Sequence, residues 1–101
     1  GPAAPGLHID AEHHEARVHG ERLDLTPLEF RLLAALAAAP GRVFSRDQLL
    51  DRLHDDTRAL ADRAIDSHVK NLRRKLQRVL PGAEPIRSVY GVGYRFEWPV
   101  A

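Results

Sequence analysis

The sequence predicts a single small α+β domain with short antiparallel strands first, then three helices, then a C-terminal β-hairpin. Apolar and polar residues alternate near both ends, over residues 7–25 and 86–98, as in strands with one covered face. Between them, apolar residues recur every three or four positions, as in amphipathic helices. Of the 101 residues, 44% are hydrophobic, which suits one modest core.

The N-terminal part of the chain divides at residue 6. Residues 1–6, GPAAPG, have no periodicity, and we expect them to be a tag remnant at the end of an interdomain linker. The domain itself is expected to span residues 7–101. Its first part, residues 7–25, predicts a small antiparallel sheet with a tight turn at residues 19–21, His-Gly-Glu.

Acidic and histidine side chains gather in this first part, at Asp10, Glu12, His13, His14 and His19. Adjacent residues of a strand point to opposite faces, so His13 and His14 would not bind one metal together. We expect exposed turn and strand side chains here, and no metal site or cofactor.

A capping box predicts where the first helix begins. Thr26 is the expected N-cap, Pro27 takes the first helical position, and Glu29 completes the box. The helix is apolar over a wide arc and is expected to be central to the core. Pro40-Gly41 ends it.

A second capping box, Ser45 with Gln48, follows a short apolar bridge at residues 42–44. The helix that it begins turns its leucines inward and ends near His54. Residues 55–61, DDTRALA, are then expected to be a loop.

The third helix is predicted from Asp62 to Leu80 and is strongly two-sided. At 100° per residue, one face carries Ile65, Val69, Leu72, Leu76 and Leu80. The opposite face carries Arg63, Ser67, Lys70, Asn71 and Arg74. One face suits a core, and the other suits phosphates and base edges.

Positive charge is concentrated on this helix. Residues 63–78 hold six bases and one acid, a net charge of +5, whereas the rest of the chain holds nine bases and thirteen acids, a net charge of −4. Such a distribution is typical of a nucleic-acid-binding element. A solvated helix face is the alternative interpretation of the charge alone.

Two alternating segments, residues 86–90 and 94–98, follow the stop at Pro81-Gly82 and are joined by Gly91-Val92-Gly93. They predict a β-hairpin with glycines at its tip. The glycines serve either the turn geometry or a close approach of the backbone to a ligand.

Several functional classes are excluded or disfavoured. The absence of cysteine excludes disulfides and thiolate chemistry. No Ser-His-Asp order, phosphate-binding loop or metal-ligand spacing is present, so we expect no enzyme. No apolar run approaches a membrane span, and we expect a cytoplasmic protein with no membrane partner.

The order of elements is that of a winged helix-turn-helix, in which the third helix enters the major groove of DNA and the hairpin forms a wing. Four blocks then resemble one family: LDLTPLEFRLL (residues 23–33), PGRVFSRDQLL (40–50), DRAIDSHVKNLRRKL (62–76) and IRSVYGVGYRF (86–96). Over residues 7–98 the chain is similar to the effector domain of the OmpR/PhoB family of bacterial two-component response regulators, and most similar to its BaeR-like branch.

This resemblance implies a regulator whose N-terminal receiver domain is missing from this chain. A cognate sensor kinase would control phosphorylation of the receiver, which would promote dimerisation. Two effector domains would then bind promoter direct repeats head to tail as a homodimer. The loop would contact RNA polymerase, through Asp55, Asp56, Thr57, Arg58 and Ala59.

Within the third helix, an amide such as Asn71 can bond adenine N6 and N7 together, which makes it the best candidate for reading a base. Lys70 and Arg74 are expected on phosphates or a guanine. The family pattern adds His68 and Arg73 as phosphate contacts. The helical wheel instead places Arg73 near Asp66, where an ion pair is the alternative, and His68 beside the core.

The family resemblance also implies DNA contacts in the wing, at Arg87, Ser88, Tyr90, Gly91 and Tyr94. The Tyr94 hydroxyl is expected on a phosphate. Tyr90 stands where some relatives have an arginine in the minor groove, and Arg87 or Arg95 could supply that cation. Phe96 and Trp98 are expected in the core.

Two further alternatives follow from the same comparison. His54 aligns with a position near the DNA backbone in relatives, and a surface histidine is the other interpretation. The alternative function for the whole domain is a winged-helix module that binds proteins.

Overall fold

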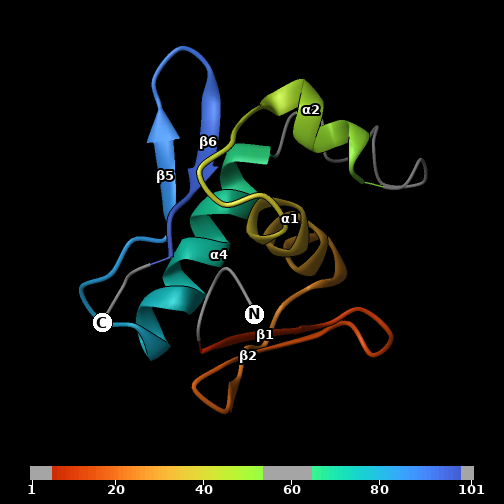
Figure 1. The fold of residues 1–101 in the computed structure, drawn as a ribbon, viewed down its shortest axis with the longest axis vertical. Helices are drawn as coiled ribbons and strands as arrows, with labels where there is room; N and C mark the ends of the chain where they lie inside the picture. Colours follow the sequence, from red (N-terminus) through yellow and green to blue (C-terminus); the bar gives the residue numbers. More distant parts are fainter. Residues whose placement is uncertain (1–5, 54–64, 99–101) are drawn as a thin grey trace.

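Two three-stranded antiparallel sheets lie at opposite ends of a helical layer in the computed structural model, which describes residues 6–53 and 65–98 (Figure 1). The elements within those residues are β1 (Leu7–Asp10), β2 (Glu15–Val18), β3 (Glu21–Arg22), α1 (Pro27–Ala37), β4 (Val43–Ser45), α2 (Arg46–Asp51), α4 (Ile65–Val79), β5 (Ile86–Val89) and β6 (Gly93–Phe96). This α+β arrangement confirms the predicted winged-helix class.

The N-terminal sheet has the strand order β1-β2-β3. His19 and Gly20 form the two-residue turn between β2 and β3, both with positive φ (50° and 86°), as the tightest hairpin turns require. The alternation of Leu23 and Leu25 with Arg22 and Asp24 had predicted a third strand that continues to Leu25. This prediction is wrong in position, because β3 ends at Arg22 and Leu23 reaches the core from non-strand backbone. The ladder also extends back to Gly6, whose carbonyl accepts a hydrogen bond from the His19 N–H (2.8 Å).

Helices α1 and α2 begin where their capping boxes predicted. The Thr26 hydroxyl accepts from the Glu29 N–H (3.2 Å), and the Glu29 carboxylate accepts from the Thr26 N–H (3.0 Å). Ser45 and Gln48 form the same reciprocal pair at the start of α2. These bonds satisfy amide groups that the first turn of a helix leaves without intrahelical partners.

The segment expected to be a bridge between α1 and α2 is a strand. Strand β4 pairs with β6, which gives a second sheet of order β4-β6-β5. The hairpin is therefore anchored by a third strand from the middle of the chain. This anchoring fixes the base of the wing against α2, which follows β4 directly.

Gly93 of β6 packs directly against the backbone of β4. A Cβ at this position would overlap the carbonyl oxygen of Phe44. At Gly93, the lack of a side chain therefore serves the close approach of a neighbouring strand, whereas the sequence had suggested turn geometry or a close approach to a ligand. At the tip, Gly91 has a φ of 79°, and the Val92 N–H donates to the Val89 carbonyl (2.9 Å) to close the turn.

Gly93→Ala is expected to destabilise the domain by about 2 kcal/mol, because β4 must move away from β6 to admit the methyl group. Urea unfolding measures this change. Gly20→Ala is the control for a glycine substitution in open space, where only the positive φ opposes the change. A Gly93→Ala protein as stable as the unaltered one would contradict the close approach.

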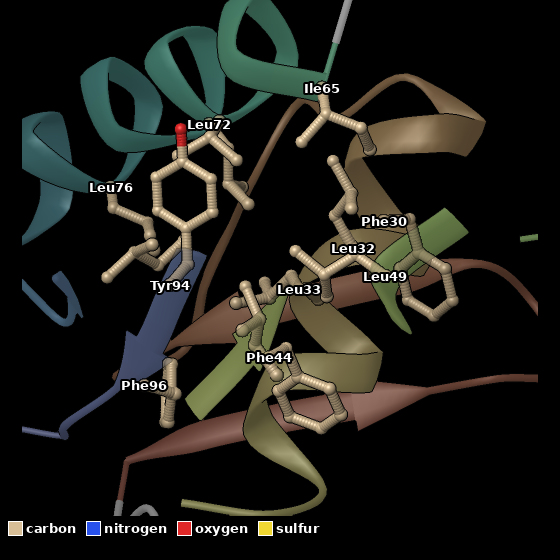
Figure 2. Close-up of a cluster of buried hydrophobic side chains, with 14 of the residues drawn as sticks. Phe30, Leu32, Leu33, Phe44, Leu49, Ile65, Leu72, Leu76, Tyr94 and Phe96 are labelled. Carbon is tan, nitrogen blue, oxygen red and sulfur yellow. The ribbon is translucent and has the colours of Figure 1, made fainter. Parts of the chain in front are cut away.

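The core lies where α1, α4 and the wing sheet meet (Figure 2). The predicted inner face of α4 is confirmed for Ile65, Val69, Leu72 and Leu76, which are all buried. Leu80, its fifth predicted member, is half-buried and follows the end of the helix at Val79. Phe96 is also buried, and Trp98 packs against it with ring centroids 5.8 Å apart. With its apolar face covered, α4 presents a single polar face outward.

Candidate nucleic-acid interface

The outward side of α4 carries long, solvated polar side chains. Ser67, Lys70 and Arg74 are exposed, and Asn71 is half-buried between them and the helix flank. Within the described residues, neither Lys70 nor Arg74 takes part in an ion pair. Their charges are therefore free to meet an external anion.

Other basic groups of this region are held by intramolecular partners. The Lys75 ammonium contacts the Glu29 carboxylate of α1 at 2.6 Å, and Glu29 is only 3% exposed. Burial raises the pKa of Glu29, but the hydrogen bonds from Lys75 and Thr26 outweigh it and leave the pKa below its usual value. Lys75, one of the six bases in the +5 segment, thus holds α4 against α1.

Arg73 binds the wing. Its Nε donates to the Ile86 carbonyl (3.0 Å), and its Nη2 donates to the Ser88 hydroxyl (2.8 Å). The guanidinium also lies over the Tyr94 ring, 5.4 Å from its centroid. The alternative ion pair with Asp66 is not formed, because Asp66 has a different cationic partner.

That partner is Arg46, in the first turn of α2. Arg46 donates through Nε and Nη2 to the two oxygens of Asp66 (2.9 and 3.2 Å). Such a two-point contact fixes the relative orientation of the two groups. It joins the N-terminal turns of α2 and α4, although the two residues are 20 positions apart in sequence.

Tyr94 completes this cluster from β6. The residue is only 5% exposed, and its hydroxyl donates to Oδ1 of Asp66. Figure 2 shows the ring rising from β6 with its oxygen at α4. In this structure the hydroxyl is thus engaged with α4, and its expected contact with a phosphate stays a prediction.

The cluster predicts how stability depends on pH. The hydrogen bond from Arg46, followed by that from Tyr94, holds the pKa of Asp66 below its ordinary value of 3.8. A lowered carboxyl pKa contributes stability that is complete above 3.8 and is lost as the pH falls through the folded-state value.

Asp66→Asn should therefore lose less stability than the unaltered protein between pH 5 and pH 3, as measured by urea unfolding at each pH. Asp24→Asn is the matched control, because Asp24 is exposed and has no ion pair within the described residues. Equal losses in Asp66→Asn and the unaltered protein would contradict the assigned pairing.

The wing offers its tip and one edge to solvent. Tyr90 is 95% exposed and Val92 is 49% exposed at the tip, beside the exposed Gly91. Arg87 is exposed lower on β5 and pairs with Glu97 (2.8 Å), which also holds Arg95. A cleft of about 400 Å³ runs along this edge, lined by Arg73, Glu84, Ile86, Arg87, Ser88, Tyr90 and Arg95.

His68 is half-buried on the flank of α4. Several predicted site residues lie outside the described residues, namely Arg63, His54 and the loop residues Asp55, Asp56, Thr57, Arg58 and Ala59. The predicted start of the third helix at Asp62 lies outside them too. The site as described consists of the outer face of α4 together with the wing.

Sequence reasoning missed Arg46 and Glu29, the two partners that orient α4. Glu29 was noticed only as a member of a capping box, and Arg46 was assigned no role. A signal for Glu29 existed: a capping-box glutamate within an otherwise apolar helix is buried and therefore needs a cation. No comparable signal marked Arg46, because its partner is set by the crossing of two helices.

The described residues contain no helix long and apolar enough to cross a membrane. Over the same ranges, no three His, Cys, Asp or Glu side chains are grouped so that they could hold a metal ion.

Comparisons with known proteins agree with this geometry. The family described as "Transcriptional regulatory protein, C terminal" matches residues 20–96. The chain is 57% identical over 91 residues to transcriptional regulatory protein BaeR of Escherichia coli O6:H1, and 42% identical over 92 residues to SrrA of Staphylococcus aureus (strain NCTC 8325). Each match covers 90% of this chain and 38% of the relative, so the chain spans about two fifths of their length.

Solved structures share the fold. The DNA-binding domain of the response regulator AdeR, in complex with an intercistronic region, has a TM-score of 0.79 at 31% identity, covering 98% of this chain and all of that one. The DNA-binding domain of CpxR from E. coli has a TM-score of 0.76 at 33% identity, covering 96% and 95% of the two chains.

The fold and the exposed face of α4 define a winged-helix domain of the transcription-regulator class, which is a class of DNA-binding proteins and not of enzymes. The chain belongs to the OmpR/PhoB family of two-component response regulators, as the C-terminal effector domain.

Proposed function

We propose that this domain binds duplex DNA with α4 in the major groove and the wing along the neighbouring backbone. The observation that carries the proposal is the sorting of cations on and around α4. Lys75 and Arg73 are engaged within the protein, whereas Lys70 and Arg74 project from the outer face with no ion pair among the described residues. A helix fits the major groove, and its unpaired cations meet phosphates there.

Asn71 is the proposed base reader. It lies on the same outer face, between the two free cations in sequence, and its amide suits the N6 and N7 atoms of adenine. Because Asn71 is half-buried, its side chain has few accessible rotamers. This favours a single hydrogen-bonding geometry toward a base. His68 and Ser67 flank it and are proposed to bond phosphates.

Asn71→Ala should reduce affinity for a selected binding site by about 1–3 kcal/mol, and affinity for random duplex much less. A selection of bound oligonucleotides first defines the site. Titration of both duplexes with each protein then gives the ratio of specific to nonspecific affinity. If Asn71→Ala leaves that ratio unchanged, Asn71 does not read a base.

For the whole protein we propose control of transcription by phosphorylation. A receiver domain, phosphorylated under the control of a sensor kinase, would promote a head-to-tail homodimer on promoter direct repeats. Residues 55–59 would contact RNA polymerase. Support comes from the transcriptional regulators among the relatives and from the related domain of Klebsiella pneumoniae RstA, solved in complex with an RstA box (TM-score 0.74, 30% identity).

A protein-binding role is the second candidate, because the wing tip exposes Tyr90 and Val92. A mobility-shift measurement with random duplex at low salt separates the two roles. Binding supports the DNA function, since nonspecific affinity arises from charge alone. Absence of binding at low salt would overturn it in favour of the protein partner.

A further inference from the structure

Two arginines face each other across the wing. Arg87 of β5 and Arg95 of β6 are directly opposed in the strand register. The strand neighbours of Arg95, Tyr94 and Phe96, are buried toward the core, and side chains alternate between the faces of a sheet, so both arginines lie on the outer face. Like charges directly opposite each other on antiparallel strands destabilise the pairing. An acid between the two arginines would therefore stabilise the wing.

Glu97 supplies that acid. Its Oε2 lies 2.8 Å from Nε of Arg87, and its Oε1 lies 2.6 Å from Nη2 of Arg95. Glu97 follows the end of β6 and is two residues beyond Arg95, which places it on the same face. Its backbone is held as well, because the Glu97 N–H donates to the Pro85 carbonyl (2.6 Å). One carboxylate thus bridges both arginines at the base of the wing.

The bridge lies at the solvent-exposed edge of the wing. The side chains of Arg87, Arg95 and Glu97 are 52%, 36% and 42% exposed. Both arginines line the cleft of about 400 Å³, which continues past Ser88 to Tyr90 at the wing tip. A phosphate that follows the wing toward its tip therefore passes this group of charges.

The bridge acts on a phosphate through its charge. Glu97 engages one nitrogen of each guanidinium, so the contact by itself does not prevent either arginine from reaching a phosphate. The two guanidiniums and the carboxylate, however, carry a net charge of +1 in place of +2. The carboxylate also repels a phosphate directly, at a distance over which charges interact appreciably in water.

We propose that Glu97 restrains the affinity of the wing for DNA, because it neutralises part of the positive charge that Arg87 and Arg95 present. The same carboxylate stabilises the hairpin, since it lies between two opposed cations. This inference rests on the proposed DNA-binding function and deepens it: Glu97 exchanges affinity for stability of the wing.

Glu97→Gln tests the proposal, because glutamine keeps the size and a hydrogen-bond acceptor but removes the charge. We expect binding to random duplex to strengthen about fivefold. The slope of log affinity against log salt should become steeper by about 0.9, as for one additional neutralised phosphate. The midpoint of thermal unfolding should fall by about 3 °C, since the arginines then oppose each other without an acid. Fluorescence anisotropy with a labelled duplex at several salt concentrations measures the first two quantities.

Glu84→Gln is the matched control for the loss of one negative charge. Glu84 is exposed and lines the same cleft, but it forms no ion pair within the described residues. Its replacement should change affinity by less than about twofold and stability very little. A second control places Glu97→Gln in a protein that also carries Arg87→Gln and Arg95→Gln. The gain in affinity should disappear there, because the charges that Glu97 neutralises are gone.

The outcomes separate the inference from the function on which it rests. If neither the unaltered protein nor Glu97→Gln binds duplex at low salt, the proposed function fails. If the unaltered protein binds, and Glu97→Gln binds no more tightly, only the restraining role of Glu97 is overturned. That role is also overturned if Glu84→Gln strengthens binding as much as Glu97→Gln, because the effect then belongs to net charge.

Discussion

Replacing Lys70 and Arg74 together by glutamine is expected to weaken binding to duplex DNA of any sequence by about 3 kcal/mol, or roughly a hundredfold. Both side chains project from the outer face of α4 without an ion pair in the described part of the chain. Each is assigned one charge-assisted contact to a phosphate, and such contacts carry no sequence information. Specific and nonspecific affinity should therefore fall together.

The salt dependence gives this prediction a second measurable consequence. Loss of two phosphate contacts should reduce the slope of log affinity against log salt by about 1.8. Fluorescence anisotropy with a labelled duplex at several salt concentrations measures both quantities. Arg17→Gln with Arg22→Gln is the charge-matched control on β2 and β3. An equal loss of affinity in both double variants would assign the effect to net charge and contradict the assigned contacts.

Glu29→Ala is expected to destabilise the domain by about 3 kcal/mol, which lowers the midpoint of thermal unfolding by about 12 °C or more. The Glu29 carboxylate is 3% exposed and bonds both the Thr26 N–H and the Lys75 ammonium. Its removal breaks the capping box and leaves Lys75 partly buried without a partner. We place the loss of stability at the lower end of the range for breaking a buried ion pair, because the Lys75 side chain is still 23% exposed.

Two further variants separate the ion pair from the cap. Glu29→Gln with Lys75→Met keeps a hydrogen-bonding group at the cap and removes both charges, so it should recover much of the lost stability. Glu21→Ala, at an exposed glutamate of β3, is the control and should change stability little. If Glu29→Ala unfolds at the same temperature as Glu21→Ala, the buried pair does not stabilise the contact between α1 and α4.

Local signals predicted the parts of the fold that depend on neighbours in sequence. The capping boxes at Thr26 and Ser45 placed two helix starts correctly, because a cap involves residues only three positions apart. The inner face of α4 and the glycine-tipped hairpin followed from periodicity in the same way. Amphipathic helices and hairpins can be predicted from local sequence because the residues that define them lie close together in the chain.

Those local signals could not predict contacts between residues that are far apart in sequence. Strand β4 is only three residues long, and it becomes a strand because β6 lies beside it. The hydrogen bond from Tyr94 to Asp66 was not predicted, because the two residues are 28 positions apart and are brought together by packing. Sequence spacing alone does not tell which polar atoms a fold turns inward.

The candidate site also has features that local sequence signals predict and features that depend on long-range contacts. Lys70, Asn71 and Arg74 were placed on an outer face by the helical wheel, and the structure places them there. In sequence, Lys75 was one more base of the +5 segment, and Arg73 was either a phosphate contact or an ion-pair partner of Asp66. The structure separates them, because each meets an acceptor from another element, either β5 or α1.

The central claim is that the outer face of α4 and the wing form the DNA-binding surface. Titration of the isotope-labelled domain with a random duplex at about 50 mM salt, followed by backbone amide chemical shifts, tests it most directly. We predict that the largest shifts fall within residues 66–78 and 86–93, and that the amides of β1 and β2 change little. Absence of shifts at equimolar duplex, or shifts centred on β1 and β2 with α4 unchanged, would contradict the account.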